Sequence, residues 1–257
     1  MLEGLVEGAA QDAEEREKSV PLDVVLERAS RQRPVKPGAS LLLPPGQHGI
    51  IAEIKRASPS KGPLADIPDP VELAKQYEAG GASAISVLTE SRRFLGSLDD
   101  LAAVAEAVSI PVLRKDFVTT SYQVAEARAY GADLVLLIMA CLSDDTAASL
   151  LQDIEALGMS ALVEAHTAEE VERAVSIGAS IIGVNARNLE TFELDRDLFG
   201  RLRHLIPDGV VAVAESAEST PADVAAYRDQ GANLVLVGEA LVTGVEPQET
   251  VAEFVAV

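Results

Sequence analysis

Acidic and basic residues occur at the ends of several apolar, strand-like segments of this sequence. In the segment that starts at Ile50, strand alternation places Glu53 and Lys55 on one face. A carboxylate and an ammonium are costly to desolvate inside a core, so we expect this pair at the mouth of a site. The turn residues Ser-Pro-Ser-Lys-Gly, from Ser58 to Gly62, then end the strand.

The same arrangement recurs further along the chain. Other strand-like segments contain or end in Lys115, Glu164, Asn185 and Glu215. Lysine and glutamate side chains that converge in a partly dry pocket can act as general acids and bases, because their charges shift one another's pKa values. A salt bridge at a strand end would explain any one of them. Five charged residues at one end of a single sheet favour a catalytic cluster.

Alternating strands and helices must bring these residues together. Strand–helix alternation at the observed spacing predicts βαβ units and a parallel sheet. A Gly-Ala pair, at 81–82, 131–132, 178–179 and 231–232, ends every second predicted helix, where glycine suits a left-handed C-terminal residue. Candidate strands begin near Ile50, Ala84, Pro111, Leu134, Ala161, Ile181, Val210 and Leu234.

Eight such units, without the Gly-x-Gly-x-x-Gly motif of a dinucleotide fold, predict an α/β protein with a (β/α)8 TIM barrel. In such a barrel the site lies at the C-terminal ends of the strands, and alternate strands contribute to the same interior layer. Arg114 and Asp116 lie on the opposite strand face from Lys115. We therefore expect them to point towards the helices and to pair with each other.

The first 48 residues precede this alternation. Residues 9–18 are charged and helix-favouring, residues 21–33 have an amphipathic helical pattern, and residues 34–46 form a Pro-rich connector. We therefore expect an N-terminal helical extension over residues 1–48, which covers the barrel mouth. The barrel domain should then occupy residues 49–257.

Composition narrows the possible partners. The 257 residues include 21 Lys or Arg and 41 Asp or Glu, which gives a net charge of −20. This charge disfavours nucleic acid and anionic membrane as partners. One cysteine and three histidines, without ligand spacing, predict no metal site. The sequence has neither a basic leader nor an apolar run of membrane-spanning length, so we expect a cytoplasmic protein.

The ends of the last two predicted strands form a second candidate site. Ser216 follows Glu215, and Gly238 and Glu239 follow the last strand. These positions correspond to the usual phosphate site of a barrel, where loop amides and a short helix N-terminus hold the anion. Ser58 could close over the same side. Two ordinary tight turns are the alternative explanation.

A few further residues have weaker claims to function. His166 could carry protons beside Glu164, although a rim position with one hydrogen bond explains it better. Cys141 has no accompanying base motif, so we interpret it as a small apolar residue. Phe94 and Phe117 could form the walls of a site for an aromatic ring, or they could belong to the core.

The segment from Ile51 to Gly62 resembles the first-strand signature of the indole-3-glycerol phosphate synthase family. Later segments match that family's strand ends in the same order, at residues 113–117, 162–164, 183–187 and 214–216. The resemblance covers essentially the whole chain, including the N-terminal extension. The first-strand segment and the Leu-Arg-Lys-Asp-Phe segment at 113–117 are its specific parts.

The resemblance implies an enzyme of tryptophan biosynthesis, a carboxy-lyase. Its substrate would be 1-(2-carboxyphenylamino)-1-deoxyribulose 5-phosphate, which undergoes ring closure, decarboxylation and dehydration to indole-3-glycerol phosphate. No cofactor and no metal are implied. We expect a cytoplasmic monomer that could associate with other tryptophan-pathway enzymes, and we expect neither nucleic acid nor membrane as a partner.

The resemblance also implies catalytic roles. Ring closure requires a proton for the ketone oxygen, and Lys115 would be that acid. Glu164 would take the acid–base role in dehydration, with Lys55 as a second candidate acid near the substrate carboxylate. Glu53 would orient Lys55 and tune its pKa.

The remaining site residues would bind or polarise the substrate. Asn185 would hydrogen-bond the changing oxygen, and Glu215 would polarise the anilino nitrogen or position a lysine. Arg187 is an expected anion partner. The expected substrate-binding residues are Ser58, Phe94, Phe117, Arg187, Leu189, Ser216, Gly238 and Glu239.

Two positions depart from the family's usual pattern. Ala217 stands where the family usually has glycine, and Asn188 stands where it usually has aspartate. Alanine would cost about 1 kcal/mol or more if the position needs a positive φ or a close approach to phosphate. Loss of the carboxylate at 188 could loosen Arg187.

Two other functions stay open at this point. A phosphoribosylanthranilate isomerase would have a similar phosphate site but would need a Cys and Asp acid–base pair, and Cys141 lies on the wrong strand for it. A designed or decayed barrel could bind phosphorylated ligands without turnover. Only Ala217 and Asn188 favour that second alternative.

Overall fold

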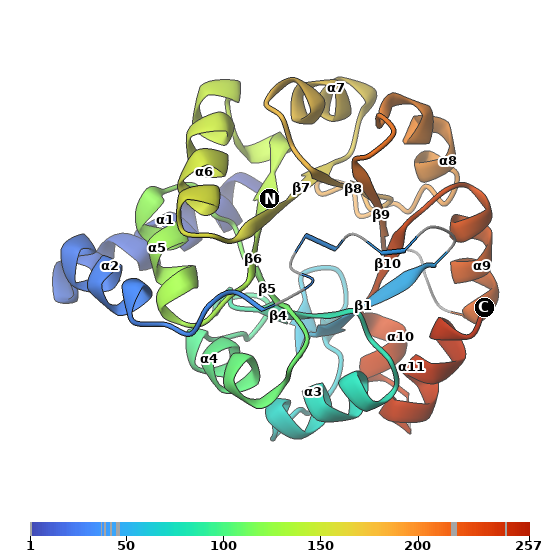
Figure 1. The fold of residues 1–257 in the computed structure, drawn as a ribbon, viewed down its shortest axis with the longest axis horizontal. Helices are drawn as coiled ribbons and strands as arrows, with labels where there is room; N and C mark the ends of the chain where they lie inside the picture. Colours follow the sequence, from blue (N-terminus) through green and yellow to red (C-terminus); the bar gives the residue numbers. More distant parts are fainter. Residues whose placement is uncertain are drawn as a thin grey trace.

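The computed structural model describes residues 2–36, 38, 40, 41, 43, 44, 47–216, 220–244 and 246–257. The barrel strands within these residues are β1 (Gly49–Ile54), β4 (Ala84–Leu88), β5 (Val112–Lys115), β6 (Leu134–Ile138), β7 (Ser160–Ala165), β8 (Ile181–Asn185), β9 (Val211–Glu215) and β10 (Leu234–Val237). They close into a parallel barrel in the order β1-β10-β9-β8-β7-β6-β5-β4 (Figure 1). The predicted TIM barrel is confirmed, and each strand begins at or next to its predicted position.

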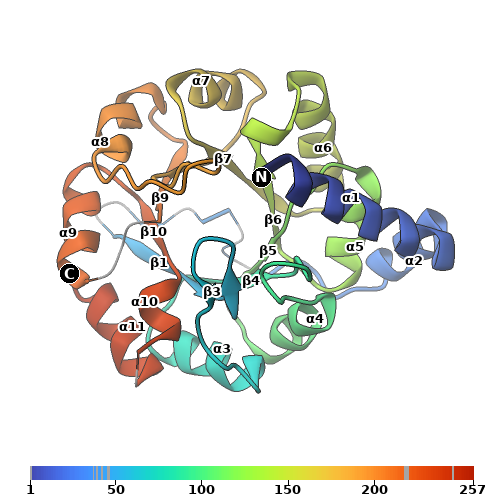
Figure 2. The same ribbon diagram turned by 180° about the vertical axis from the view of Figure 1, so that it is seen from behind.

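Helices form a ring around the barrel (Figures 1 and 2). Six of the described helices start after a Ser, Thr or Asp N-cap residue. The side chain of this residue accepts a hydrogen bond from a backbone N–H of the first turn, which explains where the helix begins. The helices that follow strands are α3 (Pro70–Ala79), α4 (Leu98–Ala107), α5 (Ser121–Ala129), α6 (Asp144–Ala156), α7 (Ala168–Ser176), α8 (Leu198–Leu202), α9 (Pro221–Asp229), α10 (Glu239–Val242) and α11 (Pro247–Val255), with short 3-10 turns η1 (Met139–Cys141) and η2 (Arg203–Leu205).

The four Gly-Ala pairs end their helices in the same way. Gly81, Gly131, Gly178 and Gly231 have φ between 86° and 96°, a region in which glycine has no Cβ to clash. The N–H of each following alanine donates to a carbonyl of the preceding helix at 2.9–3.1 Å. Each pair therefore turns the chain directly into the next even strand of the barrel.

Alternation along the strands separates two apolar layers. Ile51, Leu113, Leu162 and Val213 point into the barrel and belong to one cluster. The neighbouring strand residues pack against the helices in a second cluster. Two positions beyond each of these interior residues, the side chain again points inward, now at the C-terminal end of the strand. That is where the candidate catalytic residues stand.

The N-terminal helices are α1 (Leu2–Ser19) and α2 (Leu22–Ser30). Helix α2 packs along α5, and α1 contacts α5 and η1. Figure 2 shows α1 on the same side of the barrel as the hairpin of β2 (Ala57–Ser58) and β3 (Gly62–Pro63). Helix α1 begins earlier than the predicted residue 9, because Leu2 and Leu5 pack against the barrel's interior cluster.

The chain after α2 is attached to the opposite end of the barrel. Arg33 donates two hydrogen bonds to Asp133, at 2.8 and 3.1 Å, and the Lys36 backbone N–H donates to Asp133 at 2.9 Å. Asp133 is fully buried and also accepts the Val112 N–H at 3.0 Å. It therefore joins the extension to β5 and β6 at their N-terminal ends.

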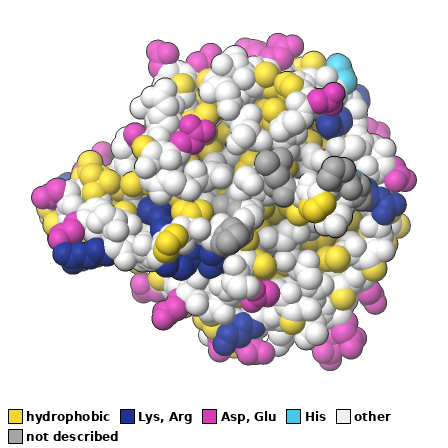
Figure 3. Space-filling model, in the orientation of Figure 1, with side chains coloured by type: hydrophobic (Ala, Val, Ile, Leu, Met, Phe, Trp, Pro, Cys, Tyr) yellow, Lys and Arg dark blue, Asp and Glu magenta, His cyan; other side chains and the backbone are white. Residues whose placement is uncertain are grey.

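Most of the described Asp and Glu side chains are exposed or half-buried. Figure 3 shows Asp and Glu side chains spread around the edge of the face that Figure 1 presents. Among the described residues, none of the helices combines the length and hydrophobicity that spanning a bilayer demands.

Candidate active site

The inward-facing ends of β1, β5, β7 and β9 converge on Lys115. The Lys115 Nζ lies 2.8 Å from Glu215 Oε2, 3.6 Å from Glu53 Oε2 and 3.7 Å from Glu164 Oε2. The Lys55 Nζ lies 2.5 Å from Glu53 Oε1. The structure thus brings together all five charged residues that the sequence places at strand ends.

Mutual attraction keeps the central charges ionised. Burial alone would lower the pKa of Lys115, but the carboxylates of Glu215, Glu53 and Glu164 raise it above its ordinary value. Burial opposes ionisation of Glu53 as well, yet the ammonium groups of Lys55 and Lys115 hold its pKa below the usual value. At neutral pH Lys115 is therefore an ammonium and Glu53 a carboxylate.

The other two carboxyl groups differ from each other. Burial would raise the pKa of Glu164, but His166 and Lys115 lower it to about 2. Burial raises the pKa of Glu215 to about 7, with Lys115 opposing the rise and Glu164 adding to it. Glu215 Oε1 is buried without a hydrogen-bond partner among the described residues. Glu164 is ionised at neutral pH, whereas Glu215 can hold a proton there.

Two glycines make room for these carboxylates. A Cβ on Gly183 would lie 2.0 Å from Glu215 Oε1, and a Cβ on Gly238 would lie 2.4 Å from Glu53 Oε1 and 2.9 Å from Lys55 Nζ. Any side chain at either position would displace the site. Gly183 was not predicted to belong to the site, although glycine inside a strand is a recognised sign of a close approach.

A cavity of about 540 Å³ opens above the cluster at the C-terminal ends of the strands. Glu53, Lys55, Lys115, Glu164 and Asn185 line it, together with Leu2 and Leu5 of α1. Glu215 is buried behind Lys115 and is not among the lining residues. All the expected substrate-binding residues line the cavity: Ser58, Phe94, Phe117, Arg187, Leu189, Ser216, Gly238 and Glu239.

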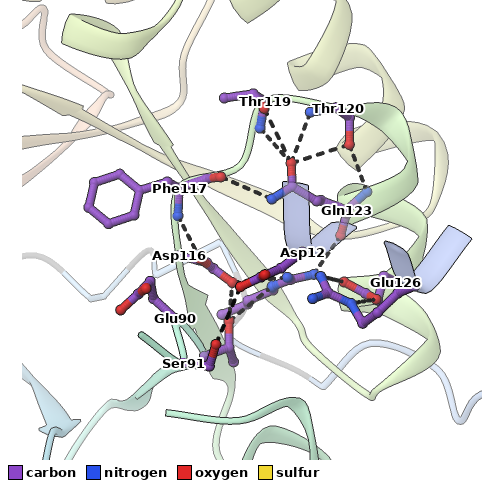
Figure 4. A network of polar contacts seen from close by, with 12 residues as sticks. Asp12, Glu90, Ser91, Asp116, Phe117, Thr119, Thr120, Gln123 and Glu126 are labelled. Atoms are coloured by element: carbon purple, nitrogen blue, oxygen red, sulfur yellow. Dashed lines mark hydrogen bonds and ion pairs between the residues drawn. The ribbon is translucent and has the colours of Figure 1, made fainter. Parts of the chain in front are cut away.

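Phe94 and Phe117 form one wall of the cavity. Their ring centroids lie 6.3 Å apart, with the rings tilted by 48°. Glu90 accepts the Phe94 backbone N–H at 2.8 Å, and Asp116 accepts the Phe117 backbone N–H at 2.9 Å. Figure 4 shows the hydrogen bond from the Phe117 N–H to the buried Asp116 carboxylate, which fixes this part of the wall.

Behind this wall lies a buried ionic network (Figure 4). Arg114 Nη2 lies 3.0 Å from Asp116 Oδ2, and Arg114 Nη1 lies 3.0 Å from Glu126 Oε2. Arg16 of α1 donates to both Glu126 oxygens at 2.6 and 2.8 Å. The predicted pairing of Arg114 with Asp116 is confirmed, and the network also anchors α1.

The loop after β8 holds Arg187 beside the cavity. Asn185 Oδ1 accepts the Arg187 N–H at 3.0 Å, and the Arg187 guanidinium donates to Phe192 O at 3.3 Å. Asn188 Oδ1 accepts two backbone N–H groups within the loop, from Glu190 at 2.8 Å and Thr191 at 2.9 Å. Asn188 therefore shapes the loop through its amide oxygen, an acceptor role that needs no charge.

The structure also decides the expectations for His166 and Cys141. The His166 ring is half-buried and makes one hydrogen bond, between Nδ1 and Glu170, as expected of a rim residue. Its Nε2 also lies 3.2 Å from Glu164, a charge contact that was not expected. Burial raises the pKa of the Cys141 thiol to about 12, with Glu164 and Glu170 adding to the rise. A thiol that stays protonated is a poor nucleophile or base.

The candidate phosphate side of the cavity is formed by the ends of β9 and β10. Ser216 has φ 62°, a left-handed conformation that is uncommon for residues other than glycine. An ion pair between Lys61 and Glu239 joins the β2–β3 hairpin to this side. Ala217 lies outside the described residues. Within those residues, no group of three or more His, Cys, Asp or Glu side chains could hold a metal ion.

Known proteins are similar to this chain over nearly its whole length. The family model for indole-3-glycerol phosphate synthase matches residues 2–254. The indole-3-glycerol phosphate synthase of Leifsonia xyli subsp. xyli is 57% identical over 254 residues, which cover 99% of this chain and 97% of that protein. The protein of the same name from Mycobacterium sp. (strain KMS) is 54% identical over 255 residues, 99% of this chain and 93% of its own length.

A solved structure of 3-hexulose-6-phosphate synthase has a TM-score of 0.64 at 18% identity, covering 81% of this chain and 98% of its own. At that identity the likeness shows a shared barrel fold alone. The match to the family model and the identity to the relatives extend over nearly the entire sequence. This chain belongs to the indole-3-glycerol phosphate synthase family.

Proposed function

We propose that the chain converts 1-(2-carboxyphenylamino)-1-deoxyribulose 5-phosphate to indole-3-glycerol phosphate. Its family makes it a decarboxylating lyase of tryptophan biosynthesis. The observation that carries the proposal is the Lys115 ammonium, held among three carboxyl groups under a cavity with an aromatic wall. Such an ammonium suits a reaction in which a ketone oxygen must gain a proton while a carbon–carbon bond forms.

The proposed reaction has three steps. The aryl carbon that bears the carboxylate bonds to the ketone carbon, and Lys115 gives a proton to the ketone oxygen. Carbon dioxide then leaves from the same aryl carbon. Finally the hydroxyl departs as water with a second proton, while a base takes the ring proton. One proton is consumed overall, because a carboxylate leaves as neutral carbon dioxide.

The surrounding charges support these roles. The raised pKa of Lys115 makes it a weak acid towards water, but a developing alkoxide is basic enough to take its proton. Glu164 would act in dehydration, with Lys55 as the acid that faces the substrate carboxylate. Of the two roles expected for Glu215, positioning a lysine fits better, because Glu215 lies behind Lys115 rather than on the cavity wall.

We assign each region of the cavity to one part of this substrate. The anthranilate ring would lie against Phe94 and Phe117, and the phosphate would lie by Ser216 and Gly238. Arg187 would pair with an anionic group of the substrate. Asn185 would hydrogen-bond the ketone oxygen, which becomes a hydroxyl and then leaves as water. The charge of Glu239, next to the phosphate side, is partly offset by its ion pair with Lys61.

The N-terminal extension would complete this site. We propose that residues 1–48 act as a cover, with Leu2 and Leu5 of α1 excluding water from one side of the cavity. The catalytic unit would be the barrel from residue 49 onwards. We further expect a cytoplasmic monomer that could associate with other enzymes of the pathway.

An assay of product formation tests the function. Purified protein is incubated with the carboxyphenylamino substrate, and indole fluorescence is followed over time. We expect fluorescent product without added metal or cofactor. Conversion of phosphoribosylanthranilate instead would identify an isomerase, which the protonated Cys141 thiol does not favour. Substrate binding without product would identify a barrel that has lost turnover.

A further inference from the structure

A carboxylate–imidazole–carboxylate chain runs from the floor of the cavity into the helical layer. His166 Nε2 lies 3.2 Å from Glu164 Oε1, and His166 Nδ1 lies 3.2 Å from Glu170 Oε2. The second oxygen of Glu164 lies 3.7 Å from Lys115 Nζ. His166 follows the last residue of β7, so the imidazole stands directly behind the reacting cluster.

The start of α7 fixes the orientation of this imidazole. Glu170 Oε2 accepts the His166 backbone N–H at 2.7 Å, and the Glu170 N–H donates to Thr167 Oγ1 at 3.1 Å. Glu170 thus holds both the backbone and Nδ1 of His166, which turns Nε2 towards Glu164. Nε2 is buried and has no aligned hydrogen-bond acceptor among the described residues, so its attraction to Glu164 is mainly that of opposite charges.

The groups around the ring favour its charged form. Burial disfavours an imidazolium, and so does the positive N-terminal end of α7. Glu164 from β7 and Glu170 from α7 outweigh both and raise the pKa of His166 to about 10. The Cys141 thiol of η1, close to the same two carboxylates, is uncharged at neutral pH. Arg173 of α7 is bonded elsewhere, to Asp144 and to carbonyl oxygens after β6.

We propose that His166 is a positioning residue: as an imidazolium between Glu170 and Glu164, it keeps Glu164 ionised and directed at Lys115. Glu164 then enters the reaction as a proton acceptor and takes the ring proton in dehydration. Proton donation falls to Lys115 and Lys55. The catalytic part of this inference rests on the proposed function, whereas the charge of the ring does not.

Nuclear magnetic resonance of the histidine ring nitrogens tests the charge without any substrate. The chain has three histidines, and the signals lost in His166→Gln identify the ring in question. At pH 8 we expect both His166 nitrogens to be protonated, since its pKa of about 10 lies above that pH. A neutral His166 ring at pH 8 would overturn the proposal.

A matched pair of variants tests the partner at the other end of the chain. Glu170→Gln should lower the pH at which His166 loses its proton by about one unit or more, because one of its two carboxylates is gone. Glu169→Gln removes the same charge from the exposed neighbouring position of α7 and should leave that pH unchanged. Equal responses of the two variants would contradict the assigned contact.

Kinetics test the consequence for catalysis. In His166→Gln we expect kcat to fall about 10–100-fold while KM changes little, because Glu164 still occupies its place but is more easily protonated. The acidic limb of the kcat profile should move to higher pH, and Glu170→Gln should show a smaller shift in the same direction. A shift to lower pH would mean that Glu164 reacts as a proton donor and would refute the proposed role.

Thermal unfolding of each variant controls for loss of structure. If His166→Gln fails to fold, Glu170→Gln can be used for both the nuclear magnetic resonance measurement and the kcat profile. This variant leaves the imidazole ring and the buried Glu164 in place. If the native enzyme forms no product, the proposed function fails while the nuclear magnetic resonance result still decides the charge of His166. The two failures are therefore distinguishable.

Discussion

Consecutive residues at the end of β5 face opposite sides of the sheet and meet opposite environments. On the inner face, Lys115 and Lys55 share three carboxyl groups, and one buried oxygen of Glu215 has no hydrogen-bond partner among the described residues. On the outer face, the fully buried Arg114 has two acidic partners at 3.0 Å.

The outer network is balanced, with Arg16 and Arg114 facing Asp116 and Glu126. A buried network whose charges and hydrogen bonds are all satisfied holds a structure in one arrangement. The inner cluster has one carboxyl group more than it has ammonium groups, so its pKa values move apart. Balanced charge therefore stabilises the framework, while the unbalanced cluster can transfer protons.

The largest effect should follow from removing the central ammonium. We expect Lys115→Ala to lower kcat by about 10²–10⁴-fold, the range that a general acid contributes. Lys115→Arg keeps the charge among the three carboxylates but cannot release a proton near neutral pH. It should therefore recover stability without recovering activity, as measured by indole fluorescence and by urea unfolding. An active Lys115→Ala enzyme would remove Lys115 from the mechanism.

On the outer face the expected loss is of stability. Glu126→Gln should lower the free energy of unfolding by about 3–5 kcal/mol, because it leaves Arg114 charged and buried with one partner fewer. Glu27→Gln removes a carboxylate from the exposed pair with Arg31 on α2 and should cost about 0.5 kcal/mol or less. Urea denaturation measures both. Similar losses of unfolding free energy in the two variants would show that the buried network stabilises the fold no more than an exposed ion pair does.

The pH dependence of folding stability should distinguish Glu215 from the residues of the balanced network. Its folded-state pKa of about 7 lies above the ordinary value of 4.5, so the folded protein retains a proton that the unfolded chain loses. This group therefore costs stability increasingly as pH rises from about 4.5 to 7, by up to about 3 kcal/mol. The stability of Glu215→Gln relative to the native protein should rise over that window. A constant difference would contradict the raised pKa.

The smallest expected effect tests the space around the inner cluster. Gly183→Ala should displace the Glu215 carboxylate, since its Cβ would lie 2.0 Å from Oε1, and should reduce kcat/KM by about 10–100-fold. Gly4→Ala is a suitable control, because no described residue outside its own stretch of α1 lies within 4 Å of the added Cβ. Its kinetics should match those of the native enzyme. Native activity in Gly183→Ala would show that Glu215 can move freely.

The barrel and its charged cluster were predictable because local rules agree with the fold. Strand alternation places Glu53 and Ile54 on opposite faces, and the repeated Gly-Ala pairs indicate where helices end. The pairing of Arg114 with Asp116 followed from the same alternation. Short-range periodicity therefore places both faces of β5 without knowledge of the tertiary structure.

Contacts between distant segments were not predictable in this way. Nothing in the local sequence shows that Gly183 lies against Glu215, or that Arg16 reaches Glu126 across 110 positions. The second carboxylate on His166 is only four residues away, but it becomes a partner because Glu170 turns back at the start of α7. Side-chain direction at a helix start depends on the cap, which the spacing of charges does not reveal.

The attachment of Arg33 and Lys36 to Asp133 has a consequence for how this protein can be cut or recombined. A chain that began at β1 would leave the fully buried Asp133 carboxylate without its arginine, and Glu126 without Arg16 at the other end of the barrel. The N-terminal extension is therefore attached to both ends of the barrel by contacts with buried carboxylates. Its helices cannot serve as an interchangeable module, and we expect them to melt together with the barrel as one cooperative unit.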